Sequence, residues 1–114
     1  MEPCLFCKIA AREVDADIVH ESDNVMAFRD INPQAPTHLL LITKEHIPSV
    51  RELGNQHANT LIELMRTARH LAKAEGVDES GWRLVTNVGR DALQSVGHLH
   101  FHLIGGRKMD WPPG

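Results

Sequence analysis

The chain has 114 residues, enough for one domain with its own core, and 42% hydrophobic and 24% charged residues are ordinary proportions for such a domain. Its net charge of −3 and its scattered lysines and arginines argue against a nucleic-acid partner, and its longest apolar run, Leu39 to Ile42, is too short to span a membrane. Two cysteines three positions apart, with no signal peptide visible over residues 1–15, indicate a reducing compartment, so we predict a cytoplasmic protein.

The first half of the chain predicts a short helix followed by strands. Apolar residues at helical spacing favour a short helix or turn over residues 4–12. Residues 14–21 have the pattern of a weak strand and residues 25–29 that of a stronger one, and the turn-forming residues 22–24 between them indicate a hairpin. The most apolar segment, residues 37–43, predicts the central strand of the sheet.

One long helix is predicted over residues 55–75, because its apolar residues recur every three or four positions. Asn55 is expected to cap its start, and Gly76 to end it in the left-handed conformation. Residues 82–88 predict a further strand. We expect the helix to cover one face of the sheet with an apolar stripe formed by Ala58, Leu61, Leu64, Met65, Ala68, Leu71 and Ala72.

Three histidines alternate with apolar residues between residues 94 and 106. This alternation is the period of a half-buried strand, so the imidazoles are predicted to leave one face and the apolar side chains the other. With about five strands in hairpin-like order, the sequence predicts an α+β fold: a single domain over residues 1–114, with an antiparallel sheet, one long helix and a short N-terminal helix. The alternating residues are His98, Leu99, His100, Phe101, His102 and Leu103.

The histidine strand has three interpretations: structural surface imidazoles, a metal site, or nucleophilic catalysis by an imidazole. Three ligands from one strand converge poorly on one ion. A neutral imidazole attacks phosphorus well and also leaves well, which suits a two-step transfer through a phosphohistidine-type intermediate. Such a transfer needs hydrogen-bond donors around the phosphoryl oxygens, for which Gln94, Ser95 and the backbone of residues 89–97 are candidates, and His38 adds a fourth imidazole.

The array from His98 to Leu103 matches the histidine triad of the HIT superfamily. Other segments resemble the Hint branch of that superfamily, which contains purine nucleoside phosphoramidases, and the resemblance covers essentially the whole chain. These segments are Phe6-Cys7-Lys8-Ile9, Ala27-Phe28-Arg29-Asp30-Ile31, Pro33-Gln34-Ala35-Pro36-Thr37-His38, Gln94-Ser95-Val96, Gly105-Gly106-Arg107 and Trp111-Pro112-Pro113-Gly114.

The resemblance implies a nucleotide hydrolase that cleaves the P–N bond of adenosine or guanosine 5′-phosphoramidates and releases the nucleoside monophosphate. His100 would be the nucleophile and form a covalent nucleotidyl-histidine. His102 and His38 would support it, and His98 would help to fix the site. No cofactor would take part in catalysis, and the family forms a homodimer.

The resemblance also implies where a nucleotide would bind. Ser95 and Asn87 would contact the phosphate or leaving group, and Gln94 would line the same loop. Asp30 would accept hydrogen bonds from the ribose hydroxyls, since a carboxylate offers only acceptors. The base would enter an apolar slot whose walls are Phe6, Phe28, Ile31 and Leu40.

Two positions depart from the Hint pattern. Hint proteins usually have a Gly-Gly pair before Gln94, where this chain has Ala92-Leu93, and commonly a bulky residue where it has Gly97. Because glycine allows the backbone to approach a phosphate closely, the first change bears on the preference for the leaving group. Neither change touches His100.

Cys4 and Cys7 form a CxxC motif, which is half of a common zinc-ligand pattern. Resemblance to zinc-carrying HIT branches suggests His46 and His98 as the other two ligands of a structural zinc site. The alternative is a pair of small buried thiols without metal, with His46 an exposed loop residue.

Other functions stay open at this point. Within enzymes, the alternative substrates for the same nucleophile are dinucleoside polyphosphates. Outside enzymes, the alternatives are a non-catalytic regulator that binds purine nucleotides and a zinc-dependent interaction module. The tail from Gly105 to Gly114 either covers an edge of the sheet in a partner subunit or is a frayed terminus.

Overall fold

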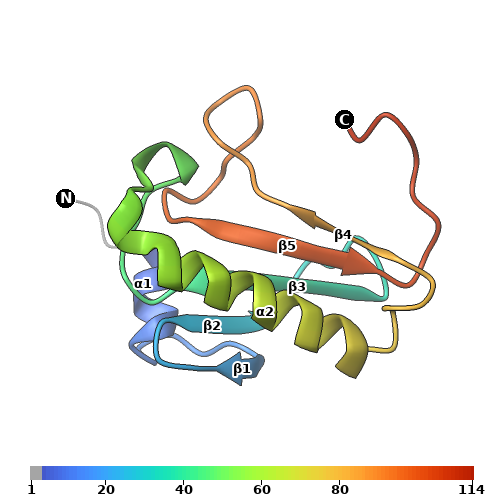
Figure 1. The fold of residues 1–114 in the computed structure, drawn as a ribbon, viewed down its shortest axis with the longest axis horizontal. Coiled ribbons are helices and arrows are strands. Elements are labelled where there is room, and N and C mark those ends of the chain that lie inside the picture. Colours follow the sequence, from blue (N-terminus) through green and yellow to red (C-terminus); the bar gives the residue numbers. More distant parts are fainter. Residues whose placement is uncertain (1–3) are drawn as a thin grey trace.

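The computed structural model describes residues 4–114, in which five antiparallel strands form one sheet in the order β1-β2-β3-β5-β4. Figure 1 shows the long helix α2 lying across this sheet. The predicted α+β fold, with one long helix and a short N-terminal helix, is confirmed. The elements are α1 (Leu5–Ala10), β1 (Ile18–Glu21), β2 (Val25–Arg29), β3 (Thr37–Thr43), the 3₁₀ helices η1 (Val50–Glu52) and η2 (Asn55–His57), α2 (Ala58–Ala74), β4 (Trp82–Val85) and β5 (His100–Gly105).

The central strand is β3, as its apolar sequence predicts, and every residue in it is buried. It pairs with β2 on one side and with β5 on the other. Leu40 lies opposite both Phe28 and His102, and directly opposed residues of antiparallel strands point to the same face. The histidines of β5 therefore share a face with apolar residues of β2 and β3.

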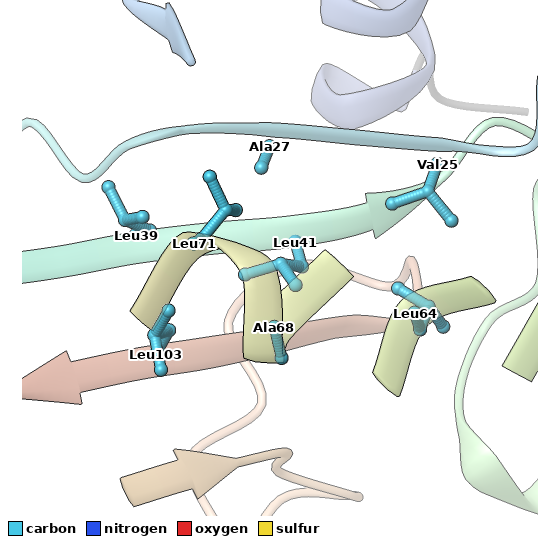
Figure 2. Close-up of a cluster of buried hydrophobic side chains, with 8 residues drawn as sticks. All are labelled: Val25, Ala27, Leu39, Leu41, Leu64, Ala68, Leu71 and Leu103. Carbon is cyan, nitrogen blue, oxygen red and sulfur yellow. The ribbon is translucent and has the colours of Figure 1, made fainter. Parts of the chain in front are cut away.

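The opposite face of the sheet packs against α2 and forms one core. Figure 2 shows side chains from α2 pointing between those of β2, β3 and β5. The strands contribute every second residue, as their period of two requires, and the helix contributes residues three or four apart. The buried members are Val25, Ala27, Leu39, Leu41, Leu64, Ala68, Leu71 and Leu103.

A second core lies on the histidine face, where α1 covers the sheet. Phe6 and Ile9, one helical turn apart in α1, are both buried. They pack against alternate residues of β2 and β3, so the short helix closes the face from which the histidines project. The strand residues of this core are Met26, Phe28, Leu40 and Ile42.

The predicted helix stripe is correct at its centre and wrong at Ala58 and Met65, both of which are exposed. Thr67 is buried in their place, because the contact face of α2 turns toward it. The predicted Asn55 cap is also wrong, since the first turn is the 3₁₀ helix η2 and α2 begins with no side-chain cap. Gly76 ends the helix with a φ of 76°, as predicted.

Strand ends differ most from the prediction. The strand expected over residues 14–21 covers only β1, the one expected over residues 82–88 covers only β4, and His98 and Leu99 precede β5. In the tail, Trp111 is 83% exposed, and the guanidinium of Arg83 lies 5.9 Å from the centre of its ring. Among residues 4–114, none of the helices combines the length and apolarity needed to cross a membrane.

Candidate active site

His100 is the first residue of β5, and its ring is fixed by a backbone hydrogen bond. Its Nδ1 lies 2.7 Å from the carbonyl oxygen of His98. A carbonyl only accepts, so Nδ1 carries the proton, and Nε2 of the neutral ring keeps a free lone pair. The ring of Phe6 packs edge-on against the imidazole, with centroids 5.0 Å apart. His100 thus has the tautomer that a nucleophile requires.

A pair of imidazoles lies beside His100, and a chain of hydrogen bonds determines which nitrogen of each ring carries the proton. The backbone N–H of Gln34 donates to Nδ1 of His38 over 3.0 Å, which places the proton of neutral His38 on Nε2. Nε2 of His38 lies 2.9 Å from Nδ1 of His102, which must then accept. The proton of His102 therefore resides on its Nε2. The rings of His100 and His102 are 5.2 Å apart.

Both members of this pair favour the neutral form. Burial, followed by the charges of His100 and His38, lowers the pKa of His102 from 6.5 to about 4. Burial also lowers the pKa of His38, although the nearby Asp30 carboxylate opposes this shift. That carboxylate lies 3.4 Å from Nε2 of His38. Near neutral pH the pair donates hydrogen bonds without adding a positive charge beside His100.

His98 does not extend the histidine strand outward but is fully buried next to the N-terminal cysteines. Its Nε2–H donates to the carbonyl oxygen of Thr43 over 2.6 Å, so its Nδ1 is unprotonated. That Nδ1 lies 3.2 Å from Sγ of Cys4 and 3.5 Å from Sγ of Cys7. As the alternation predicts, His98 lies on the side of the sheet that α1 covers, where its ring packs edge-on against Phe6 with centroids 5.9 Å apart, but it precedes β5 and is not part of the strand.

Cys4, Cys7, His46 and His98 form a four-residue cluster, which we call the Cys-His tetrad. Their ligand atoms all lie within 4.8 Å of one another, and Nδ1 of His46 is 3.2 Å from Sγ of Cys7. The tetrad joins α1, the loop after β3 and the segment before β5. Its sulfurs and ring nitrogens are the atoms that tetrahedral zinc prefers.

The spacing within the tetrad also fits zinc. Sulfur and nitrogen ligands at about 2.3 and 2.0 Å from a tetrahedral ion lie about 3.5 Å from each other. The separations between His98 and the two sulfurs are 3.2 and 3.5 Å. The hydrogen bond from His98 to Thr43 leaves the ligand nitrogen free, as in many zinc sites. Burial, with Cys4 adjacent, raises the pKa of the Cys7 thiol to about 11, and a bound cation would favour the thiolate instead.

The residues expected around a base and ribose are only partly together. Phe6, Phe28 and Leu40 pack in the core beneath the histidine face. Ile31 is fully exposed and lies outside that core. Asp30 follows β2, and its Oδ1 accepts a hydrogen bond of 2.8 Å from the backbone N–H of Asn32, which orients the carboxylate.

The loop before His98 is braced by Gln94. Its side-chain oxygen accepts from the Gly89 N–H over 3.0 Å, and its Nε2 donates to the carbonyl oxygens of Pro48 and Val96 over 2.8 and 3.1 Å. Gln94 therefore shapes the loop from within, whereas Ser95 is exposed and Asn87 is half-buried.

Leu93 occupies one of the two positions where Hint proteins usually have glycine. Its φ is 62°, in the left-handed region that bulky residues rarely adopt, and its side chain is 81% exposed. The loop thus keeps a glycine-type backbone at this position and adds an apolar side chain to it.

Several groups that hold the site were absent from the sequence prediction. The backbone N–H of Gln34 orients His38, and the carbonyl oxygen of Thr43 orients His98. Thr86 Oγ1 donates to the His100 carbonyl oxygen over 2.8 Å and anchors the start of β5. Two of these contacts use backbone atoms, which carry no residue-specific signal, and the threonine contact depends on tertiary structure.

Comparison with known proteins gives consistent matches. The model of the HIT domain family matches residues 11–109. A protein from Brassica juncea named 14 kDa zinc-binding protein is 47% identical over 112 residues, which are 96% of this chain and 98% of the relative. A purine nucleoside phosphoramidase from Escherichia coli strain K12 is 44% identical over 108 residues, which are 95% of this chain and 91% of the relative. The crystal structure of a HIT family hydrolase from Legionella pneumophila matches with a TM-score of 0.96 and 51% identity, covering 98% of this chain and 100% of that one.

Proposed function

This chain belongs to the HIT domain family, and on that premise we propose that it hydrolyses the P–N bond of adenosine and guanosine 5′-phosphoramidates. The observation that carries the proposal is the 2.7 Å hydrogen bond from Nδ1 of His100 to the His98 carbonyl, which leaves Nε2 free to attack. The relative from Escherichia coli, named purine nucleoside phosphoramidase, supports this substrate class.

In the first step, Nε2 of His100 bonds to the α-phosphorus while the P–N bond breaks. The amine leaves with a proton, and we assign its donation to the hydroxyl of Ser95, which is exposed and so regains a proton from solvent. The product is a nucleotidyl-histidine whose ring is positively charged. The His98 carbonyl oxygen, already at Nδ1, stabilises that charge.

In the second step, water attacks the phosphorus and the P–Nε2 bond breaks. The nucleoside monophosphate leaves, one proton passes to solvent, and neutral His100 is restored. The Nε2–H of His102 is the donor that we assign to a phosphoryl oxygen in both steps. Because His102 stays neutral at physiological pH, it gives this hydrogen bond without repelling the charged intermediate.

We assign the nucleotide contacts to the residues that the resemblance implies. Asp30 accepts from the ribose hydroxyls, Asn87 contacts the phosphate, and Gln94 holds the loop that surrounds it. The base enters beside the core on the histidine face, against Phe6, Phe28 and Leu40, with Ile31 closing over it from its exposed position.

The Cys-His tetrad is proposed to hold one zinc ion with a structural function. Zinc bound by four protein ligands has no open position for substrate, so it would tie α1 to the segment before β5 and supply no reactive water. The relative from Brassica juncea, named as a zinc-binding protein, supports this assignment.

A time course of AMP release tests the function. Wild-type protein and the His100→Ala variant are incubated with adenosine 5′-phosphoramidate and, separately, with a diadenosine polyphosphate. We expect AMP from the phosphoramidate with wild-type protein and at least about a thousandfold less with the variant. Acid quenching during turnover should give a protein mass increased by one adenylyl group, and this adduct should be missing from the variant.

Other results would point to other functions. Faster cleavage of the dinucleotide would assign the chain to dinucleoside polyphosphate hydrolysis and implicate Ala92-Leu93. Binding of AMP without turnover of either compound would indicate a nucleotide-binding regulator and contradict the proposal. His70→Ala, an exposed residue of α2, is the matched control and should behave as wild type.

We also propose a homodimer, since the edge strand β4 is open to pairing with a second copy. The tail beside it, from Met109 to Gly114, would then lie near the partner. Light scattering coupled to size-exclusion chromatography checks this, and a mass of one chain at micromolar concentration would contradict it.

A further inference from the structure

The two cysteines of the Cys-His tetrad are arranged for a reaction with each other. Cys4 is the residue that caps α1, and its Sγ accepts a hydrogen bond of 3.4 Å from the backbone N–H of Cys7. The two Sγ atoms lie within 4.8 Å of each other, and both sulfurs approach Nδ1 of His98. Residues three apart in the first turn of a helix have the Cα separation that a disulfide spans.

We propose that Cys4 and Cys7 are a thiol-oxidation site, at which a peroxide-class oxidant forms a disulfide that slows the reaction at His100. The effect on His100 rests on the proposed function, whereas the oxidation itself does not.

The oxidation is a balanced two-electron reaction. The sulfur of Cys4, which accepts the backbone N–H of Cys7, attacks a peroxide oxygen, the O–O bond breaks, and a sulfenic acid and water form. The second thiol attacks that sulfur, and a second water leaves as the S–S bond forms. In sum, two thiols and one hydrogen peroxide give one disulfide and two waters. Where the tetrad holds zinc, the same reaction removes both of its sulfur ligands, so the ion is released.

The tetrad is open to an oxidant of this size. Cys4 and Cys7 are both half-buried, and His46, which faces Cys7, is exposed. His98 is fully buried behind them. Solvent therefore reaches the sulfur side of the tetrad, while the side nearer the nucleophile is closed.

His98 transmits a change at the sulfurs to the nucleophile. Its ring contacts both sulfurs through Nδ1, and its backbone carbonyl accepts the hydrogen bond that sets the tautomer of His100. A disulfide has no S–H group, so the unprotonated Nδ1 of His98 loses the donor that the two thiols offer it, while the sulfurs close to about 2.05 Å. The bond from His98 to Thr43 remains and limits the movement, so we expect partial loss of activity.

The expected effect is on kcat. Loss of a positioning contact of this kind typically lowers activity by about tenfold. The proposed ribose and phosphate contacts, Asp30 and Asn87, lie outside the tetrad, so KM should change much less than kcat. A general loss of folded structure would instead reduce the amount of active protein and nucleotide binding together.

The experiment oxidises full-length, zinc-supplemented protein with hydrogen peroxide and then reverses the reaction with dithiothreitol. Free thiols, zinc released to a chromogenic chelator, and kcat and KM for adenosine 5′-phosphoramidate are followed on the same samples. We expect one intramolecular disulfide, zinc release, and a fall in kcat, all reversed by the reductant. The ¹⁵N NMR shifts of His100 should show a loss of its single tautomer in the oxidised protein.

Two variants separate the causes. Cys7→Ser cannot form the disulfide, so its kcat should not respond to peroxide. His46→Gln keeps both thiols while removing a zinc ligand, so it should still form the disulfide and lose activity on oxidation. Circular dichroism verifies that each variant is folded. The oxidation and reduction of the wild-type protein tests the proposal even if a variant fails to fold.

Three outcomes would overturn the proposal. Thiols that stay free, or that cross-link between molecules, would show that the pair is no oxidation site. A disulfide that leaves both kcat and the His100 NMR signals unchanged would show that His98 does not transmit the change. If the protein has no phosphoramidase activity, the thiol and NMR measurements still decide the issue, so the two proposals fail separately.

Discussion

The guanidinium of Arg29 meets the carboxylate of Glu75 in two parallel hydrogen bonds, of 2.8 and 3.0 Å. Arg29 is the last residue of β2, directly before Asp30, and Glu75 caps the C-terminal end of α2. The pair therefore fixes the end of the long helix next to the segment that carries the proposed ribose contact. Hydrogen bonding by Arg29 holds the pKa of Glu75 below its usual value.

Replacing Glu75 by Gln should lower the free energy of unfolding by about 1 kcal/mol, a modest value because the Arg29 side chain is 42% exposed. A carboxylate whose pKa is lower in the folded state stabilises fully above its unfolded pKa, near 4.5, and this contribution disappears as the pH falls through the lowered value. Urea unfolding from pH 7 to pH 3 measures both effects. If the free energy of unfolding of the variant falls as steeply with decreasing pH as that of the wild type, the stabilising contribution assigned to Glu75 is wrong.

Replacing His38 by Ala should lower kcat by about tenfold to a hundredfold with little change in KM. The variant removes the donor to Nδ1 of His102, so that ring can place its proton on either nitrogen and no longer presents a fixed Nε2–H. Steady-state kinetics with adenosine 5′-phosphoramidate measures the effect. A rise in KM alone would assign His38 to nucleotide binding instead.

His102 should make the protein less stable in mild acid. Its pKa is about 4 in the folded protein against 6.5 ordinarily, so the unfolded chain takes up this proton first. The resulting contribution to the free energy of unfolding is complete above pH 6.5 and is lost as the pH falls toward 4. Chemical unfolding across this range should show a shallower slope for His102→Asn than for wild type.

Removing zinc should lower the melting temperature by at least about 5 °C, because an ion bound tightly to the folded state alone stabilises it by several kcal/mol. Metal analysis of protein purified without a histidine tag should find close to one zinc per chain. Cys4→Ser should abolish both the metal and the difference in melting temperature. Less than about a tenth of an equivalent in zinc-supplemented wild-type protein would leave the Cys-His tetrad as a metal-free thiol pair.

A side chain at Gly105 should destabilise the fold. A Cβ added there would lie 3.0 Å from the Cβ of Val77, which is buried after the end of α2. Gly105→Ala should therefore cost about 1–3 kcal/mol of unfolding free energy. The double variant with Val77→Ala should recover part of that loss, and strictly additive effects would show that the two positions do not touch.

Sequence periodicity predicts the elements in which the pattern of apolar residues is regular along the whole strand. β3 is apolar throughout and central, and the alternation in β5 places Leu103 and His102 on opposite faces. Periodicity fails where tertiary contacts decide the conformation. His98 continues the alternation in sequence, yet it precedes β5, and its ring bonds to the Thr43 carbonyl and faces two cysteines.

The candidate site divides in the same way. The identities of the five histidines and two cysteines could be read from their spacing and from the family resemblance. The nitrogen that carries the proton in each imidazole could not be predicted, because it depends on hydrogen bonds to the Gln34 N–H and to the carbonyl oxygens of His98 and Thr43. Backbone groups are the same in every residue, so only the folded chain reveals which ones meet a ring.

The place of β5 in the sheet has a consequence for how the protein is made. β5 is synthesised after the other strands yet lies between β3 and β4, and β4 pairs with it alone. Until β5 has left the ribosome, β3 keeps one open edge and β4 has no partner. A nascent chain at this stage should therefore be sensitive to protease. The strand that completes the sheet also delivers His100 and His102, so catalytic competence and resistance to proteolysis should arise in the same folding event.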